Sequence, residues 1–250
     1  MSDKGLVVIT GASSGFGEAT AMAFARLGHP LALGARRVEK LQEVARSCSR
    51  AGSPEARALE LDVTSLPSIQ KFAAQAGTPE ILINNAGMAR GRDPIDKLRD
   101  EDIVAMVDTN VTGLFRVTRA FLPGMIARKK GHVVNVGSLA AHGVYEGGVV
   151  YCPTKHAVRA ISQAMRLELT GTNLRVTEID PGMAETEFSV VRLGDAEKAK
   201  AVYAGIKGGL TAADVADAIV WAATRPAHVN IGEIVMTATA QASLTKVHRE

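Results

Sequence analysis

Short, uninterrupted apolar runs alternate along this chain with longer segments that have helical periodicity. Strands that are apolar on both faces must be covered on both sides, so such runs indicate a parallel sheet between two layers of helices. Seven strands are predicted, at residues 6–9, 31–33, 58–61, 81–83, 132–136, 175–179 and 233–236. Helices are predicted at residues 17–27, 39–47, 65–74, 101–127, 151–169 and 212–223. This alternation predicts a doubly wound α/β fold of three layers with a seven-stranded parallel sheet.

The chain is predicted to form one domain. A length of 250 residues suits either one large α/β domain or two small ones. Neither an internal repeat nor a flexible linker divides the sequence, so we assign residues 1–250 to a single domain. Residues 182–209 contain no strand candidate and are expected to form a mobile insertion within that domain.

Charge and cysteine content argue against several functional classes. The net charge is only +3, and the densest basic run, residues 128–130, reads as a solvated helix end, so no nucleic-acid partner is expected. No apolar run approaches the roughly 20 residues that span a membrane. Residues 1–4 lead straight into a strand, without room for a signal peptide. Cys48 and Cys152 are far apart and lack metal-ligand spacing, so we expect a cytoplasmic protein without a metal site.

Residues 10–17, Thr-Gly-Ala-Ser-Ser-Gly-Phe-Gly, follow the first predicted strand and open the first helix. Glycines there let the backbone turn sharply and approach a pyrophosphate, which the positive end of the helix dipole attracts. The spacing Gly-x-x-x-Gly-x-Gly differs from the general dinucleotide fingerprint, and an ordinary glycine-rich turn is the alternative. The strand before and the helix after favour a Rossmann-type dinucleotide site. Its predicted contact residues are Gly11, Ser13, Ser14, Gly15, Phe16 and Gly17.

Two arginines at the end of the second predicted strand indicate which dinucleotide is bound. NAD sites carry an acidic residue about 20 positions beyond the glycines, for the ribose 2′-hydroxyl. Here Arg36 and Arg37 occupy that region, with no carboxylate before Glu39. Guanidinium groups suit a 2′-phosphate, so we predict NADP as the cofactor. Surface arginines at a helix start are the alternative, in a position where cations are slightly unfavourable.

Polar residues also follow the third and fourth predicted strands. Asp62 and Val63 end the third strand, where a carboxylate could accept the adenine amino group. Asn85, Ala86 and Gly87 end the fourth strand. The carboxyl ends of parallel strands meet at the ligand crevice, so we predict cofactor contacts at all five residues. Ordinary turn chemistry explains either group taken alone.

Tyr151 and Lys155 are four residues apart in a predicted helix, which places the phenol and the ammonium on one face. A cation that close favours the phenolate, so the pKa of Tyr151 is expected to fall from about 10. Such a tyrosine can donate a proton to a carbonyl oxygen or accept one from an alcohol. Pro153 is tolerated only near a helix start, which places Tyr151 in the first turn. The Tyr-x-x-x-Lys pattern alone also arises by chance.

Together these motifs resemble the short-chain dehydrogenase/reductase family, in its compact single-domain branch. The similarity extends over residues 10–242 and includes, besides the segments above, Asn110, Ser138 and the pair Pro181-Gly182. The resemblance implies hydride transfer between a nicotinamide and a carbonyl or alcohol. In that reaction Tyr151 would be the acid/base, and Lys155 would lower its pKa and hold the nicotinamide ribose.

The resemblance implies further roles. Ser138 would bind the substrate oxygen beside Tyr151, and Asn110 would anchor a water relay to Lys155. A solvent-facing asparagine inside a helix is the alternative for Asn110. Pro181, Gly182 and Thr186 would belong to the segment that closes over the nicotinamide.

The region after Pro181 corresponds to the family's variable substrate loop, here about residues 182–209. Residues 186–189, 197–199, 226–231 and 247–249 resemble the branch that oxidises small 3-hydroxy acids, such as serine or allo-threonine, with NADP. Arg192 is a candidate for binding the substrate carboxylate, and a charged surface residue of a mobile loop is an equal explanation. Residues 141–148 are expected to form the other pocket wall.

Two other functions fit the same residues. A 3-oxoacyl or broad carbonyl reductase would share every catalytic residue, and an NADP-sensing regulator without catalysis is the more remote alternative. Family similarity also implies a homotetramer, or a homodimer, assembled through the helices at 101–127 and 151–169.

Overall fold

A computed structural model of the chain describes residues 4–250. Residues 1–3, which carry most of the argument against a signal peptide, lie outside the described residues. Seven strands form one parallel sheet, as predicted, and their order is β3-β2-β1-β4-β5-β6-β7. They are β1 (Val7–Thr10), β2 (Leu31–Ala35), β3 (Ala56–Glu60), β4 (Ile81–Asn84), β5 (Gly131–Val136), β6 (Leu174–Pro181) and β7 (Glu233–Met236).

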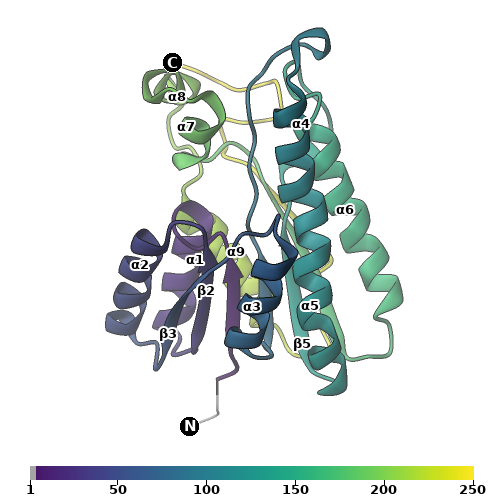
Figure 1. The fold of residues 1–250 in the computed structure, drawn as a ribbon. Helices are drawn as coiled ribbons and strands as arrows, with labels where there is room; N and C mark the ends of the chain where they lie inside the picture. Colours follow the sequence, from purple (N-terminus) through teal and green to yellow (C-terminus); the bar gives the residue numbers. More distant parts are fainter. Residues whose placement is uncertain (1–3) are drawn as a thin grey trace.

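Helices cover both faces of the sheet and complete the three layers (Figure 1). One layer contains α1 (Gly15–Arg26), α2 (Val38–Ala51) and α9 (Ala212–Ala223). The other contains α3 (Leu66–Ala76), α5 (Gly113–Ala127) and α6 (Tyr151–Glu168). Successive strand residues enter different cores: Val7 and Ile9 pack with the first layer, and Val8 between them packs with the second. This double burial explains why the strands are continuously apolar.

The predicted helix at 101–127 is present without a break, but it is not α-helical throughout, which refines the sequence-based assignment. Helix α4 (Asp100–Val107) passes through a π-helical turn, η2 (Asp108–Thr112), before α5 begins. Asn110 lies in this turn and is 2% exposed, so the solvent-facing alternative is wrong. Its side chain makes two hydrogen bonds to the backbone of Met88, at 2.8 Å each. Widened turns of this kind often occur at functional sites.

The predicted insertion at 182–209 is largely helical. It contains α7 (Glu187–Leu193) and α8 (Ala196–Tyr203), which lie beyond the carboxyl ends of the strands (Figure 1). Side-chain caps explain where both helices begin, since Thr186 accepts from the amide of Phe188 and Asp195 accepts from the amide of Glu197. A parallel bridge between Ala184 and Leu210 closes the base of the segment.

The strand order indicates where a ligand crevice lies. After β3 the chain returns to the other side of β1 to form β4, so the loops after β1 and β4 diverge to opposite faces. In doubly wound folds ligands bind in the crevice at this switch point, outside the carboxyl ends of the strands. Over residues 4–250, no helix combines the length and apolar character needed to cross a membrane.

Candidate active site

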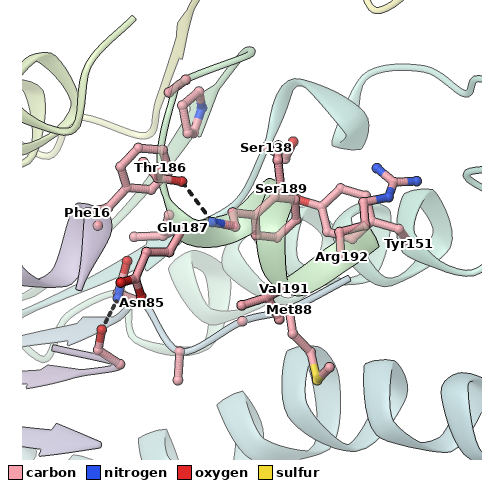
Figure 2. A pocket seen from close by; sticks show the side chains of 18 of the residues that line it. Phe16, Asn85, Met88, Ser138, Tyr151, Thr186, Glu187, Ser189, Val191 and Arg192 are labelled. Atoms are coloured by element: carbon pink, nitrogen blue, oxygen red, sulfur yellow. Dashed lines mark hydrogen bonds between the residues drawn. The ribbon is translucent and has the colours of Figure 1, made fainter. Parts of the chain in front are cut away.

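A cleft of about 520 Å³ opens at the carboxyl ends of the strands. Figure 2 shows Phe16, Asn85 and Glu187 towards one end of it, and Tyr151 and Arg192 towards the other. Of the residues predicted to contact cofactor or substrate, all but Gly17 line this cleft. These lining residues are Gly11, Ser13, Ser14, Gly15, Phe16, Arg36, Arg37, Asp62, Val63, Asn85, Ala86, Gly87, Ser138, Tyr151, Lys155, Pro181, Gly182, Thr186 and Arg192.

The glycine turn has the sharply turned backbone that its sequence predicts. Gly11 and Gly15 have φ values of 66° and 58°, a region that strongly favours glycine. Gly17 is buried and does not line the cleft, because its α-carbon packs against the carbonyl of Gly11 and the side-chain amide of Asn85. It therefore serves close packing instead of ligand contact. The Asn85 side chain donates to the carbonyl oxygens of Thr10 and Gly11, at 2.9 and 3.1 Å, and ties β4 to the turn.

The two predicted arginines lie at the same end of the cleft. The Arg37 guanidinium donates to the hydroxyls of Ser13 and Ser14, at 3.1 and 2.6 Å. It also pairs with Glu187 at 2.8 Å, and Lys40 pairs with the same carboxylate at 2.9 Å. Hydrogen bonds from Lys40 and Arg37 lower the pKa of Glu187 to about 2. Lys40 was missed from the sequence, although its spacing from Arg37 places it one turn further along α2.

Asp62 follows β3 and lines the cleft. One of its carboxylate oxygens accepts from the backbone amide and the hydroxyl of Thr64, at 2.9 and 2.7 Å. This local turn matches the alternative explanation for Asp62, and it also fixes the carboxylate at the wall of the cleft. Contact between Asp62 and an adenine ring stays a prediction.

At the other end of the cleft, Tyr151 is the first residue of α6 and Lys155 follows one turn later, as predicted. The Lys155 ammonium lies 5.8 Å from the centroid of the Tyr151 ring and donates to the carbonyl of Val136 at 2.9 Å. Asn110 lies behind them, with its amide 3.1 Å from the hydroxyl of Thr154. The Asn110 carboxamide oxygen and the Lys155 ammonium both face the α-carbon of Gly87.

The expected lowering of the tyrosine pKa is wrong for this arrangement. Burial raises the pKa of Tyr151 above its usual value, and a hydrogen bond from Ser138 opposes that rise. Burial also lowers the pKa of Lys155 to about 8, against the opposing charges of Asp180 and Glu178. Burial of the Tyr151 phenol raises its pKa more than the Lys155 cation can lower it, because the Lys155 ammonium bonds to a carbonyl oxygen and faces the tyrosine ring. At neutral pH, Tyr151 is therefore a protonated acid.

Ser138 is held by a polar network that sequence reasoning missed. The buried carboxylate of Asp180, on β6, accepts from the Ser138 backbone amide at 2.7 Å. The His142 imidazole lies 2.9 Å from the other Asp180 oxygen and 3.0 Å from Glu233 on β7. Such ligand atoms can also hold a metal ion, and the expectation of no metal site stays a prediction. No sequence spacing connects these residues, since they come from three separate segments.

Arg192, on α7, reaches the catalytic end of the cleft. Its guanidinium lies 5.7 Å from the centroid of the Tyr151 ring (Figure 2). It donates to the Tyr145 hydroxyl at 2.7 Å and to the carbonyl of Gly147 at 2.9 Å. Arg192 is therefore a partly buried wall residue, and the loop-surface alternative is wrong. Tyr145 belongs to the predicted pocket wall at 141–148, and the Phe188 ring lies 5.6 Å from that of Tyr151.

A family model described as short chain dehydrogenase matches residues 5–196 of the chain. The chain belongs to the short-chain dehydrogenase family. The predicted resemblance is thus confirmed, together with the Rossmann-type fold.

Several members of the family are similar to the chain over nearly its whole length. The NADP-dependent 3-hydroxy acid dehydrogenase of Schizosaccharomyces pombe is 39% identical over 99% of this chain and 98% of its own. The serine 3-dehydrogenase of Agrobacterium fabrum is 41% identical over 92% of each chain. A solved structure, the closed form of serine dehydrogenase complexed with NADP+, is 42% identical and covers 98% of this chain and 100% of that one. Its TM-score is 0.90.

Some further lining residues of this short-chain dehydrogenase come from segments that carried no motif. Gln241 and Leu244 follow β7, and Tyr203 ends α8. Met88 and Arg92 follow the Asn-Asn-Ala-Gly segment after β4. Only proximity to known motifs could have indicated Met88, because single residues in variable loops have no periodicity or spacing to detect.

Proposed function

We propose that this short-chain dehydrogenase transfers a hydride between NADP and a small 3-hydroxy acid, interconverting its alcohol with a carbonyl. The proposal rests chiefly on one observation: a single cleft has cationic Arg36 and Arg37 at one end and Tyr151, Ser138 and Arg192 at the other. The similar 3-hydroxy acid and serine dehydrogenases support the same substrate class.

The residues of the cleft fit the parts of NADP. Arg36, Arg37 and Lys40 supply positive charge for the 2′-phosphate, and guanidinium groups bind phosphate with charge-assisted hydrogen bonds. The glycine turn, with the amino end of α1, provides backbone amides for the pyrophosphate. Lys155 is placed to hold the nicotinamide ribose. When bound, the nicotinamide supplies or accepts the hydride.

The protein's own residues donate and accept the proton. The raised pKa of Tyr151 keeps its phenol protonated, ready to donate to a carbonyl oxygen during reduction. The Ser138 hydroxyl is the second donor to that oxygen, and both stabilise the alkoxide charge as it develops. In the oxidation direction Tyr151 must first lose its own proton, and Lys155 and Asn110 lie behind it for passing that proton on. The phenolate then takes the alcohol proton.

Arg192 gives the site its preference for acids. Its guanidinium beside Tyr151 would pair with the substrate carboxylate while the alcohol reaches Tyr151 and Ser138. Because Arg192 already bonds to Tyr145 and Gly147, its position is set before substrate arrives. A 3-oxoacyl or broad carbonyl reductase would use the same tyrosine and serine without needing this cation.

The substrate assignment is tested by nicotinamide absorbance with purified protein and either NADP+ or NAD+. Serine, allo-threonine and 3-hydroxyisobutyrate should be oxidised with NADP+, and matched alcohols without the carboxylate should be poor substrates. Activity confined to acyl thioesters would favour the 3-oxoacyl reductase. No turnover of any alcohol or carbonyl would favour a regulator.

We also propose that the protein is a homotetramer, or a homodimer, assembled through α5 and α6. Apolar side chains exposed on and near these helices support this, among them Phe115 on α5 and Leu167 on α6, which are 54% and 79% exposed. Size-exclusion chromatography with light scattering tests it, and a monomer would refute it. Cytoplasmic location stays a prediction.

A further inference from the structure

The carboxylate of Glu187 holds the cations that a 2′-phosphate needs. Glu187 begins α7 and lies 2.8 Å from Arg37 and 2.9 Å from Lys40, which are 150 and 147 residues earlier in the chain. Its oxygens thus stand where phosphate oxygens would bond, at the start of α2. The three side chains are 44–50% exposed. Exposed ion pairs are worth little individually, so a dianionic phosphate can displace them.

The same short helix touches the catalytic end of the cleft. Phe188 packs near the Tyr151 ring, and Ser189 lies 2.7 Å from the Tyr203 hydroxyl of α8. Arg192, five residues after Glu187, bonds to Tyr145. Helix α7 therefore connects the ribose-phosphate end of the cleft with the residues that face the substrate.

We propose that Glu187 is a specificity-determining residue for the cofactor. Its carboxylate competes with the 2′-phosphate of NADP for Arg37 and Lys40, so phosphate binding frees the start of α7 from α2. The 2′-hydroxyl of NAD has no charge with which to displace a carboxylate, so NAD leaves the contact in place. The position of the substrate-facing helix thereby depends on which dinucleotide is bound.

The adenosine fragments 2′,5′-ADP and 5′-AMP test the competition, because they differ only in the 2′-phosphate. Isothermal titration should show that Glu187→Gln binds 2′,5′-ADP about three- to tenfold more tightly than wild type, the gain expected from removing exposed ion pairs. Affinity for 5′-AMP should not change. The matched control is Glu197→Gln, which removes the same charge from α8, where Glu197 pairs with Lys200 at 2.8 Å. This control should alter neither affinity.

Hydrogen exchange gives a readout independent of affinity. In the wild type, 2′,5′-ADP should raise amide exchange in residues 187–193, whereas 5′-AMP should not. In Glu187→Gln, exchange in this segment should already be high without a ligand.

Three results would overturn the proposal. Weaker 2′,5′-ADP binding by Glu187→Gln would mean that Glu187 stabilises the bound cofactor instead of competing with it. Equal exchange with both fragments would show that the phosphate does not act on α7, and no binding of 2′,5′-ADP would remove its basis. The proposal rests on NADP as cofactor but not on the substrate. Failure of 3-hydroxy acid turnover would leave these fragment measurements unaffected.

Discussion

The fully buried carboxylate of Asp180 accepts a hydrogen bond of 2.7 Å from the backbone amide of Ser138. Ser138, the proposed second donor to the substrate oxygen, is therefore positioned by β6 as well as by β5, which it follows. Replacing Asp180 with alanine leaves that amide without its acceptor, which costs about 1–3 kcal/mol and lets Ser138 move. A displacement of about 1 Å can reduce turnover about 100-fold.

We therefore expect Asp180→Ala to lower kcat about 10- to 100-fold while the Kd for NADP stays within about twofold. Steady-state kinetics and cofactor titration measure the two quantities separately. Asp180→Asn keeps an acceptor oxygen and should retain more activity. Equal losses of kcat and cofactor affinity would mean that the cleft as a whole had been disturbed.

Tyr151→Phe should lower kcat about 100- to 10,000-fold, the usual contribution of general acid–base catalysis. The phenyl ring preserves packing against Phe188, so cofactor affinity should be retained. Stopped-flow measurement of hydride transfer would locate the loss in the chemical step. Retention of most of the wild-type activity would exclude Tyr151 as the acid/base.

Arg37→Gln should weaken NADP binding about 10- to 100-fold and leave NAD binding nearly unchanged, because charge-assisted contacts to the 2′-phosphate are worth about 1.5–3 kcal/mol. Fluorescence titration with both reduced cofactors gives the comparison. Arg26→Gln, on an exposed side chain at the end of α1, is the matched charge control. An unchanged NADP-to-NAD ratio would contradict the assignment of the phosphate end.

Arg192→Gln should raise KM for 3-hydroxy acids about 10- to 100-fold, since a charge-assisted contact is lost. KM for an alcohol of similar size without a carboxylate should not change. Arg192→Lys keeps the charge but not the planar fork, so it should recover part of the affinity. If both substrates suffered equally, Arg192 would serve the pocket wall through Tyr145 instead.

Glu178 makes stability depend on pH. Burial, and then the charge of Asp180, raise its pKa to about 8 from 4.5. Between these values the folded protein holds a proton that the unfolded chain has lost, so stability falls as pH rises from about 4.5 to about 8. Glu178→Gln removes this loss and should stabilise the protein at pH 8, with little gain near pH 4.5.

Urea unfolding at both pH values measures the difference. Glu60→Gln, at the exposed end of β3, is the matched charge control. If Glu178→Gln stabilised the protein equally at both pH values, the gain would not come from the ionisation of Glu178.

The sheet could be predicted because its signal is local. Ile9 and Val8 pack in opposite cores, and a strand that is buried on both faces is visible in the sequence as a continuous apolar run. The boundaries of α9 and β7 follow the prediction as well, since Thr211 caps α9 and Glu233 begins the short apolar run of β7.

The parts that escaped prediction depend on contacts between distant segments. The π-helical turn exists where Asn110 bonds to the backbone of Met88, and helical periodicity cannot detect one additional residue in a turn. The rise in the Tyr151 pKa comes from burial by the whole cleft, whereas its spacing from Lys155 indicated only the nearby charge. The support of Ser138 by Asp180 and His142 likewise appears only when the strands are assembled.

The turn at Asn110 also limits which changes of length the gene can accept. A π-helical turn contains one residue more than an α-helical turn, and each helical residue corresponds to about 100° of rotation. An in-frame deletion of Val111 would therefore close the π-helical turn into an α-helical one, without rotating the stripe of Leu114, Val117 and Phe121 by about 100° relative to α4. The cost would fall on Asn110, which the wide turn holds against the backbone of Met88. Loss of a single codon there should disturb the core less than loss of one elsewhere in α5.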